Sequence, residues 1–229
     1  HGTRFSPVTG SPEQPVDVVT AVGAGVGAGV PLLIGTAVDE AHAAIFAKPR
    51  YLDPDWDLTA EQLRDAIRPG LSRRDQADEL ARRYAGIRPE SPRGRIFLDI
   101  GSDQFLIRSL RLLEARLAGG GVDSWVYSID VAHDEFPGSY HGIEMPFVFS
   151  TLGAHEHLAV TPAREALARE TSAAFVAFAR TGVPGAGAPW PRYDLVGRRQ
   201  VVLGESGIRE EADFRAEVRH AWSGIPVGI

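Results

Sequence analysis

One short apolar run constrains the fold of this chain more than any other stretch. Val30–Thr36 reads VPLLIGT, is bounded by turn residues and is followed by helical sequence. A continuous apolar strand of this length is typical of a parallel sheet covered on both faces. Asp39 and Glu40 follow it, and functional groups of α/β proteins collect just beyond the carboxyl ends of strands. We therefore predict an α/β fold, and a carboxylate at this place can orient an imidazole. For either carboxylate alone, a helix cap or a solvated acidic pair is the better explanation.

A second predicted strand leads to a histidine. Ser124–Asp130 alternates aromatic or apolar residues with smaller or polar ones, and the loop Val131–Tyr140 then delivers His141. His141 opens into the apolar stretch YHGIEMPFVF, Tyr140–Phe149. An imidazole is the natural general base near pH 7. A lone histidine beside apolar residues is more often a hydrogen-bonded structural residue, so His141 by itself does not identify catalysis.

Capping signals and periodic leucines predict the remaining elements. Thr59 with Gln62 and Ser72 with Asp75 have the spacing of capping boxes, and Thr161 precedes a proline as helix caps often do. We expect helices at Thr59–Ile67, Ser72–Tyr84, Ser102–Leu117, Pro162–Arg180 and Ala212–Trp222, a short helix with a glycine turn within Val18–Val30, an edge strand at Gln200–Leu203, and loops at Pro69–Gly70, Pro89–Gly94 and Gly182–Asp194.

Composition excludes several classes of function. The 229 residues are 44% hydrophobic and 24% charged, which suits one large globular domain or two small ones. A net charge of -6 without a basic patch argues against nucleic-acid binding. The absence of cysteine removes disulfides and thiol nucleophiles and fits a reducing, cytoplasmic compartment. No apolar run approaches the ~18 residues of a membrane span, so we expect no membrane partner.

No cofactor or metal site is expected. The glycines of Val18–Val30 follow neither the Gly-x-Gly-x-x-Gly register nor a Gly-Lys-Ser/Thr phosphate loop. His155–His157 reads His-Glu-His but lacks further ligands at a useful spacing, so a surface loop is the preferred interpretation.

Two motifs carry a resemblance to a known family. Pro31–Phe46, PLLIGTAVDEAHAAIF, resembles the acid segment of the type-B carboxylesterases, the cholinesterase-like branch of the α/β-hydrolases, which typically reads PLLIGTNxDEGxxF. Tyr140–Phe149 is similar to the histidine segment of that family, HGxExPFVF. Phe97–Asp130 resembles the helix and aromatic strand between the two segments, and WPRYD at Trp190–Asp194 resembles a late WPxY element. The resemblance spans nearly the whole chain and implies an α/β-hydrolase fold with esterase activity.

The resemblance also implies roles for two residues and shows what the chain lacks. Glu40 takes the place of the triad acid and His141 that of the base, in the chain order of an α/β-hydrolase, where the serine precedes both. No Gly-x-Ser-x-Gly elbow and no oxyanion-hole glycine loop lie upstream. Gly204–Gly207, GESG, follows the histidine and lacks the second glycine of the elbow, so Ser206 is interpreted as a turn residue.

The acid segment departs from the family pattern at two positions. Ala41 stands where the family usually has glycine, so the loop must avoid a backbone conformation that only glycine tolerates. His42 is an alternative partner for Glu40. His141 is preferred because its motif matches the family more fully.

The economical interpretation is that residues 1–229 are the C-terminal portion of one α/β-hydrolase domain, whose N-terminal half with the nucleophile elbow is absent. The chain is then a fragment, a proteolytic product or one piece of a nicked molecule, and is inactive alone. Its expected partners are a small-molecule ester and the N-terminal half of the same protein. Two alternatives stay open: a non-catalytic binding or adhesion module of the same fold, and a self-sufficient small binding domain that hides the edge of its sheet.

Overall fold

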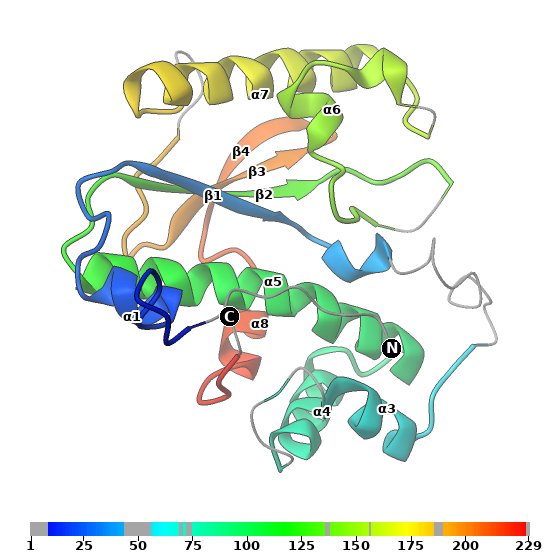
Figure 1. The fold of residues 1–229 in the computed structure, drawn as a ribbon. Helices are drawn as coiled ribbons and strands as arrows, with labels where there is room; N and C mark the ends of the chain where they lie inside the picture. Colours follow the sequence, from blue (N-terminus) through cyan, green and yellow to red (C-terminus); the bar gives the residue numbers. More distant parts are fainter. Residues whose placement is uncertain are drawn as a thin grey trace.

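A four-stranded sheet forms the centre of the structure (Figure 1). The computed structural model describes residues 9–43, 56–68, 71, 75–135, 138–155, 157–185 and 190–227. The strands are β1 (Leu32–Ala37), β2 (Ser124–Asp130), β3 (Arg199–Gly204) and β4 (Gly207–Ala212), in the spatial order β1-β2-β3-β4. The first three strands run parallel, and β4 returns antiparallel to β3. The predicted α/β class and the strands beginning near Val30 and at Ser124 are confirmed.

The strand register brings the carboxyl ends of three strands to one edge of the sheet. Ala37 of β1 lies opposite Ile129 of β2, and Asp130 lies opposite Gly204 of β3. The loops that follow β1 and β2 therefore start side by side, although about a hundred residues separate them in the chain.

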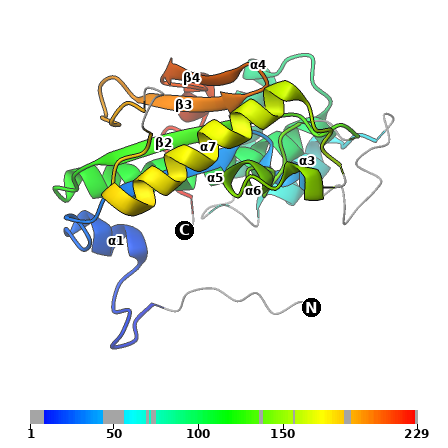
Figure 2. The same ribbon diagram turned by 90° about the horizontal axis from the view of Figure 1, so that it is seen from above.

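Helices cover both faces of the sheet (Figures 1 and 2). One face carries α6 (Met145–Val148) and α7 (Pro162–Thr181), with the short 3-10 helix η4 (Leu152–Ala154) beside them. The other face carries α1 (Val18–Gly23), α3 (Ala60–Ile67), α4 (Asp75–Ile87), α5 (Arg93–Ala118) and α8 (Ala216–Ala221). A second 3-10 helix, η1 (Glu40–Ala43), follows β1. Within the described ranges, no helix has both the length and the apolar character needed to cross a bilayer.

Alternating side chains of β2 serve two separate hydrophobic cores. Val126 belongs to the cluster beneath the sheet with Leu113 and Trp222. Ile129 belongs to the cluster above it with Phe147. Because successive side chains of a strand point to opposite faces, a strand covered on both sides is apolar at nearly every position.

Two of the predicted helix caps, at Thr59 and Thr161, are present. Thr59 accepts a hydrogen bond from the Gln62 backbone N–H (3.1 Å), and the Gln62 side chain accepts one from the Thr59 N–H (2.8 Å), which forms a capping box. Thr161 accepts a bond from the Arg164 N–H at the start of α7. Gly182 ends α7 with a φ of 76°, a left-handed conformation that favours glycine.

The predicted start of the helix α5 is wrong. Helix α5 begins at Arg93, inside the predicted loop Pro89–Gly94 and well before the predicted start at Ser102. Its first turns are enclosed on several sides, with Ile96 and Leu98 both buried, so they show no single apolar stripe. The Ser72 cap and the Pro69–Gly70 loop lie outside the described residues.

The C-terminal part also differs from the prediction. β3, which contains the predicted edge strand Gln200–Leu203, lies between β2 and β4 and is therefore an interior strand. β4 was not predicted because half of its sequence, GIREEA, is charged; its partly exposed side chains form ion pairs such as Arg199–Glu210. The predicted helix at Ala212–Trp222 begins only at Ala216, because β4 continues to Ala212.

Candidate active site

Glu40 lies at the carboxyl end of β1, at the start of η1. Its side chain is only 7% exposed. Oε1 accepts a hydrogen bond from the backbone N–H of Ala37 (2.8 Å), which holds the carboxylate against the end of its own strand. A buried carboxylate needs such partners because it has lost the solvation of bulk water. One carboxylate oxygen is thus used for anchoring, and Oε2 is left to face the loop from β2.

His141 is the group that Oε2 meets. The Nδ1 atom of His141 lies 2.6 Å from Oε2 of Glu40, and the His141 backbone N–H donates to the Glu40 carbonyl (3.3 Å). The His141 side chain is 64% exposed, and Phe105 is its ring neighbour, with 5.7 Å between centroids. The structure therefore brings the two predicted site residues into direct contact, with Glu40 buried and His141 open to solvent.

This contact assigns the protons of the imidazole. A carboxylate can only accept from a neutral histidine, so the proton lies on Nδ1 and the lone pair on Nε2. A carboxylate in this position fixes the tautomer and stabilises the imidazolium that forms when Nε2 takes a proton. The pair can act as a general base, provided that a group with a proton to lose is brought to Nε2.

Asp39, the other carboxylate predicted after β1, has different partners. Its Oδ1 accepts from Arg95 (3.0 Å) and its Oδ2 from the backbone N–H of Ser139 (2.9 Å). Glu40, not Asp39, is therefore the carboxylate that contacts His141.

His42 is buried beside Asp39 rather than placed against the histidine loop. Its Nε2 lies 3.6 Å from Oδ1 of Asp39 and 3.9 Å from Oδ1 of Asp99. Burial opposes ionisation of Asp99, but the hydrogen bond from His42 and the charge of Arg95 outweigh it and hold the pKa of that carboxyl below its usual range.

Asp39, His42 and Asp99 have the ligand types of a divalent metal site, with ligand atoms within 4.8 Å of one another. Arg95 already supplies a cation there, because it pairs with Asp39 at 3.0 Å and with Asp99 at 2.8 Å. We interpret the cluster as an ion-pair network beneath the acid loop. His155 and His157 are not part of any such converging group among the described residues, and Glu156 lies outside them.

Glu144 is a neighbour of the pair that the sequence analysis did not single out. Burial, followed by the nearby charge of Glu40, raises the pKa of its carboxyl. Its Oε2 is buried and has no hydrogen-bond partner among the described residues. The signal was present in the sequence, since Glu144 is the glutamate of the HGIE motif, but the motif alone did not indicate its burial.

Ser206 lies in the turn between β3 and β4 and is exposed, as predicted for a turn residue. It is separated from β1 by the intervening strands.

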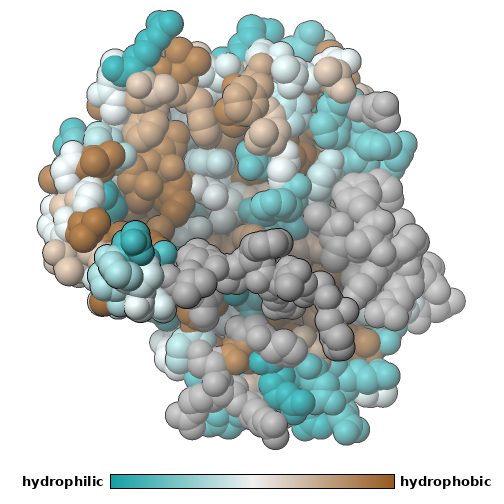
Figure 3. Space-filling view, in the orientation of Figure 1, coloured by the Kyte–Doolittle hydropathy of each residue, from teal (hydrophilic) through white to brown (hydrophobic). Residues whose placement is uncertain are grey.

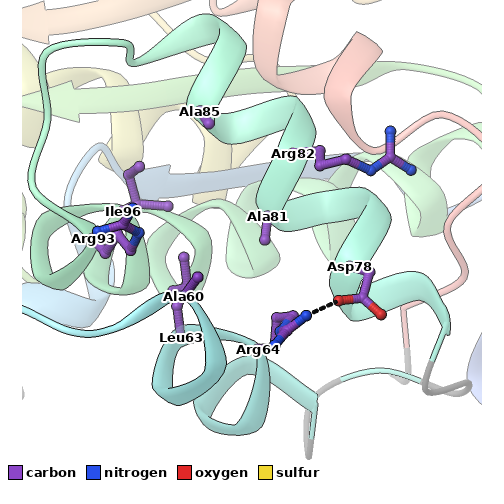
Figure 4. Close-up of a pocket in the computed structure, with 9 residues that line it drawn as sticks. All are labelled: Ala60, Leu63, Arg64, Asp78, Ala81, Arg82, Ala85, Arg93 and Ile96. Atoms are coloured by element: carbon purple, nitrogen blue, oxygen red, sulfur yellow. Dashed lines mark hydrogen bonds and ion pairs between the residues drawn. The ribbon is translucent and has the colours of Figure 1, made fainter.

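A pocket of about 350 Å³ lies elsewhere, between α3, α4 and the start of α5 (Figure 4). Its apolar lining includes Leu63, Ala81 and Ile96, and an ion pair between Arg64 and Asp78 (3.1 Å) closes one side. Neither Glu40 nor His141 lines this pocket, so it is separate from their contact.

The chain has homologues among known esterases, although no family model matches it. It is 28% identical over 222 residues to the para-nitrobenzyl esterase of Bacillus subtilis strain 168, a type-B carboxylesterase. The match covers 94% of this chain and the C-terminal 42% of that protein. The resemblance predicted from the acid and histidine motifs is therefore confirmed as homology.

Solved structures give the same result. A carboxylesterase from Geobacillus stearothermophilus superposes with a TM-score of 0.73 at 29% identity, covering 89% of this chain and 42% of that one. A para-nitrobenzyl esterase superposes with a TM-score of 0.68 at 28% identity, covering 90% and 41%. The chain has the fold of part of an α/β-hydrolase, and it spans about two fifths of the length of these relatives.

Proposed function

We propose that this chain is the C-terminal portion of a serine carboxylesterase domain. In this proposal Glu40 is the acid of the catalytic triad, His141 is its base, and an N-terminal half of the same protein supplies the serine and the oxyanion hole. The observation that carries the proposal is the 2.6 Å contact between Oε2 of Glu40 and Nδ1 of His141 at the carboxyl edge of the sheet. Homology to esterases supports it independently.

The proposed reaction follows from the proton assignment. Nε2 of His141 removes the proton of the serine hydroxyl as the oxygen attacks the ester carbonyl, and Glu40 stabilises the resulting imidazolium. The imidazolium then gives the proton to the leaving alcohol. In the second half of the reaction, His141 activates a water molecule, which releases the carboxylic acid and regenerates the serine. Neither Glu40 nor His141 is the nucleophile of this reaction, so this chain alone is expected to be inactive.

In this proposal the N-terminal half binds along the free edge of β1. β1 pairs only with β2 among the described strands, so its other edge presents unpaired backbone groups. Apolar side chains gather over β1 and toward α7 on the same face (Figure 3). Met145 and Phe149, close to His141 in the chain, are also exposed. Continuation of the sheet beyond β1 would cover these surfaces and bring the serine to the edge where His141 lies.

The substrate class is a small-molecule ester. The name of the Bacillus subtilis relative points to para-nitrobenzyl esters as the first compounds to test. The alternative function, a non-catalytic binding or adhesion module, predicts no turnover even for the complete protein.

The test is ester hydrolysis by the complete protein and by this chain alone. Chromogenic short-chain esters and para-nitrobenzyl esters should be turned over only by the complete protein. His141→Ala should abolish turnover, whereas the matched control His220→Ala, on α8, should leave it unchanged. Equal rates for His141→Ala and the wild type would refute the assignment of the base, and a complete protein without turnover would favour the non-catalytic alternative.

A further inference from the structure

The exposed imidazole of His141 needs support from its backbone. Its side chain is mostly open to solvent, and the imidazole contacts Glu40 and Phe105. A large displacement of the ring would break the 2.6 Å contact between Nδ1 and Glu40, because a hydrogen bond weakens steeply with distance and angle. The position of the loop before His141 therefore decides how well the imidazole meets its acid.

Asp39 holds that loop at two points. Its backbone N–H donates to the carbonyl of Ser139 (2.9 Å), and its Oδ2 accepts from the backbone N–H of the same residue (2.9 Å). Ser139 is 1% exposed, and its hydroxyl donates to the carbonyl of Ile129 at the end of β2 (2.9 Å). Two residues further on, the Glu40 carbonyl accepts from the His141 N–H. Asp39 thus bonds to Ser139, and Glu40 to His141, through their backbones.

The carboxylate of Asp39 is itself fixed from behind. Arg95 on α5 donates to Oδ1 of Asp39 and, through Nε, to Asp99. Gly138 allows the loop to come this close: it has a φ of +90°, and a Cβ on it would collide with the Asp39 carboxylate. The side chain of Asp39 therefore lies between a rigid helix and the loop that ends in His141.

We propose that Asp39 is a positioning residue, which sets the distance between Glu40 and His141 by holding the Ser139 backbone. It touches neither the imidazole nor any reacting atom. The proposal rests on the proposed function only for its catalytic consequence, because the contact between Glu40 and His141 exists in this chain without the serine.

The experiment is proton NMR on this chain. The Nδ1–H proton of His141, bonded to a carboxylate, gives a far-downfield resonance that the variant His141→Ala identifies. Asp39→Ala should broaden or remove this resonance, and it should accelerate hydrogen exchange of the Ser139 amide by about tenfold or more, since that amide loses its acceptor. Asp39→Leu, close in shape but without an acceptor, is the second variant if the alanine protein does not fold, and the same changes are expected.

Asp194→Ala is the matched control. Asp194 also accepts backbone N–H groups, those of Val196 at 2.8 Å and Gly197 at 2.7 Å, but in the turn before β3, at the amino end of that strand. It should leave the His141 resonance unchanged. A wild-type resonance in a folded Asp39 variant, or an equal loss in Asp194→Ala, would overturn the proposal.

Turnover by the complete protein separates this proposal from the proposed function. Asp39→Ala should lower kcat about a hundredfold with little change in KM, the effect typical of a small misplacement of a catalytic group. If Asp39→Ala loses the His141 resonance but the complete wild-type protein hydrolyses no ester, the proposed esterase function is refuted and the positioning role of Asp39 stays supported.

Discussion

Two buried carboxylates of this protein have been given opposite surroundings. Glu40 is 7% exposed and its partner His141 is 64% exposed. Asp103, on α5, is fully buried, and its partner Arg215 is only 14% exposed, with 2.6 Å between the charged groups. The first pair is closed on one side and open on the other, whereas the second is enclosed on all sides. A reacting group must meet its substrate, so only the first arrangement suits chemistry, and the second suits stability.

The enclosed pair belongs to a chain of hydrogen bonds. The indole N–H of Trp222 donates to the Tyr84 hydroxyl (2.8 Å), which donates to Oδ2 of Asp103 (2.5 Å). Arg215 also donates to the carbonyl of Val38, two residues before Glu40. Burial raises the pKa of Asp103 to about 6 against the opposing effects of Arg215 and Tyr84. Within this network, α4, α5 and α8 are joined beneath the sheet.

The largest effect is expected at the open pair. Glu40→Gln should lower kcat of the complete protein about ten-thousandfold, because an amide cannot stabilise the imidazolium and can hold the wrong tautomer. The melting temperature should change little by comparison. Kinetics with a chromogenic ester and a thermal melt measure the two quantities; a rate within tenfold of wild type would mean that Glu40 is not the acid.

Asp103→Asn should act on stability alone. The folded pKa of Asp103, about 6, lies above its unfolded value, so the protonated carboxyl is favoured in the folded state. The stabilisation that comes from this protonation is fully present below pH ~4 and is lost as pH rises through 6. The loss amounts to about 3 kcal/mol. The difference in unfolding free energy between wild type and variant, from urea titrations at several pH values, should therefore change across this window. A constant difference would contradict the assigned pKa.

Tyr84→Phe tests whether the enclosed network contributes through its hydroxyl. The indole N–H of Trp222 and one oxygen of Asp103 would lose their partner in a site without solvent, which should cost about 2 kcal/mol of unfolding free energy. Urea denaturation measures it. The His141 resonance should be unchanged, and a change there would break the separation between the two regions.

Phe105→Ala should have the smallest effect. Its ring lies 5.7 Å from that of His141 between centroids, and Phe105 is partly exposed. Loss of one aromatic contact is worth about 1 kcal/mol, which corresponds to about a fivefold fall in kcat/KM of the complete protein. Unchanged kinetics would show that Glu40 and the backbone hold the imidazole without the ring.

Much of the fold could be predicted from the sequence because the patterns that indicate its strands and helices are local. The apolar run of β1, the alternation in β2 and the capping box at Thr59 are each decided by residues close together in the chain. The start of α5 and the strand β4 were missed because their residues are placed by contacts elsewhere. The first turns of α5 are buried on several sides, and β4 is a charged strand held by its pairing with β3.

The sequence by itself determined which residues are candidates for chemistry, Glu40 and His141, because Glu40 comes just after a strand, His141 ends the loop that follows the next one, and both lie in recognisable motifs. Only the tertiary structure decided that Glu40 and His141 are in direct contact, and that Asp39 holds the loop at Ser139. The physical reason is separation along the chain. These contacts join residues about a hundred positions apart, and their geometry exists only once parallel strands bring the two loops to the same edge of the sheet.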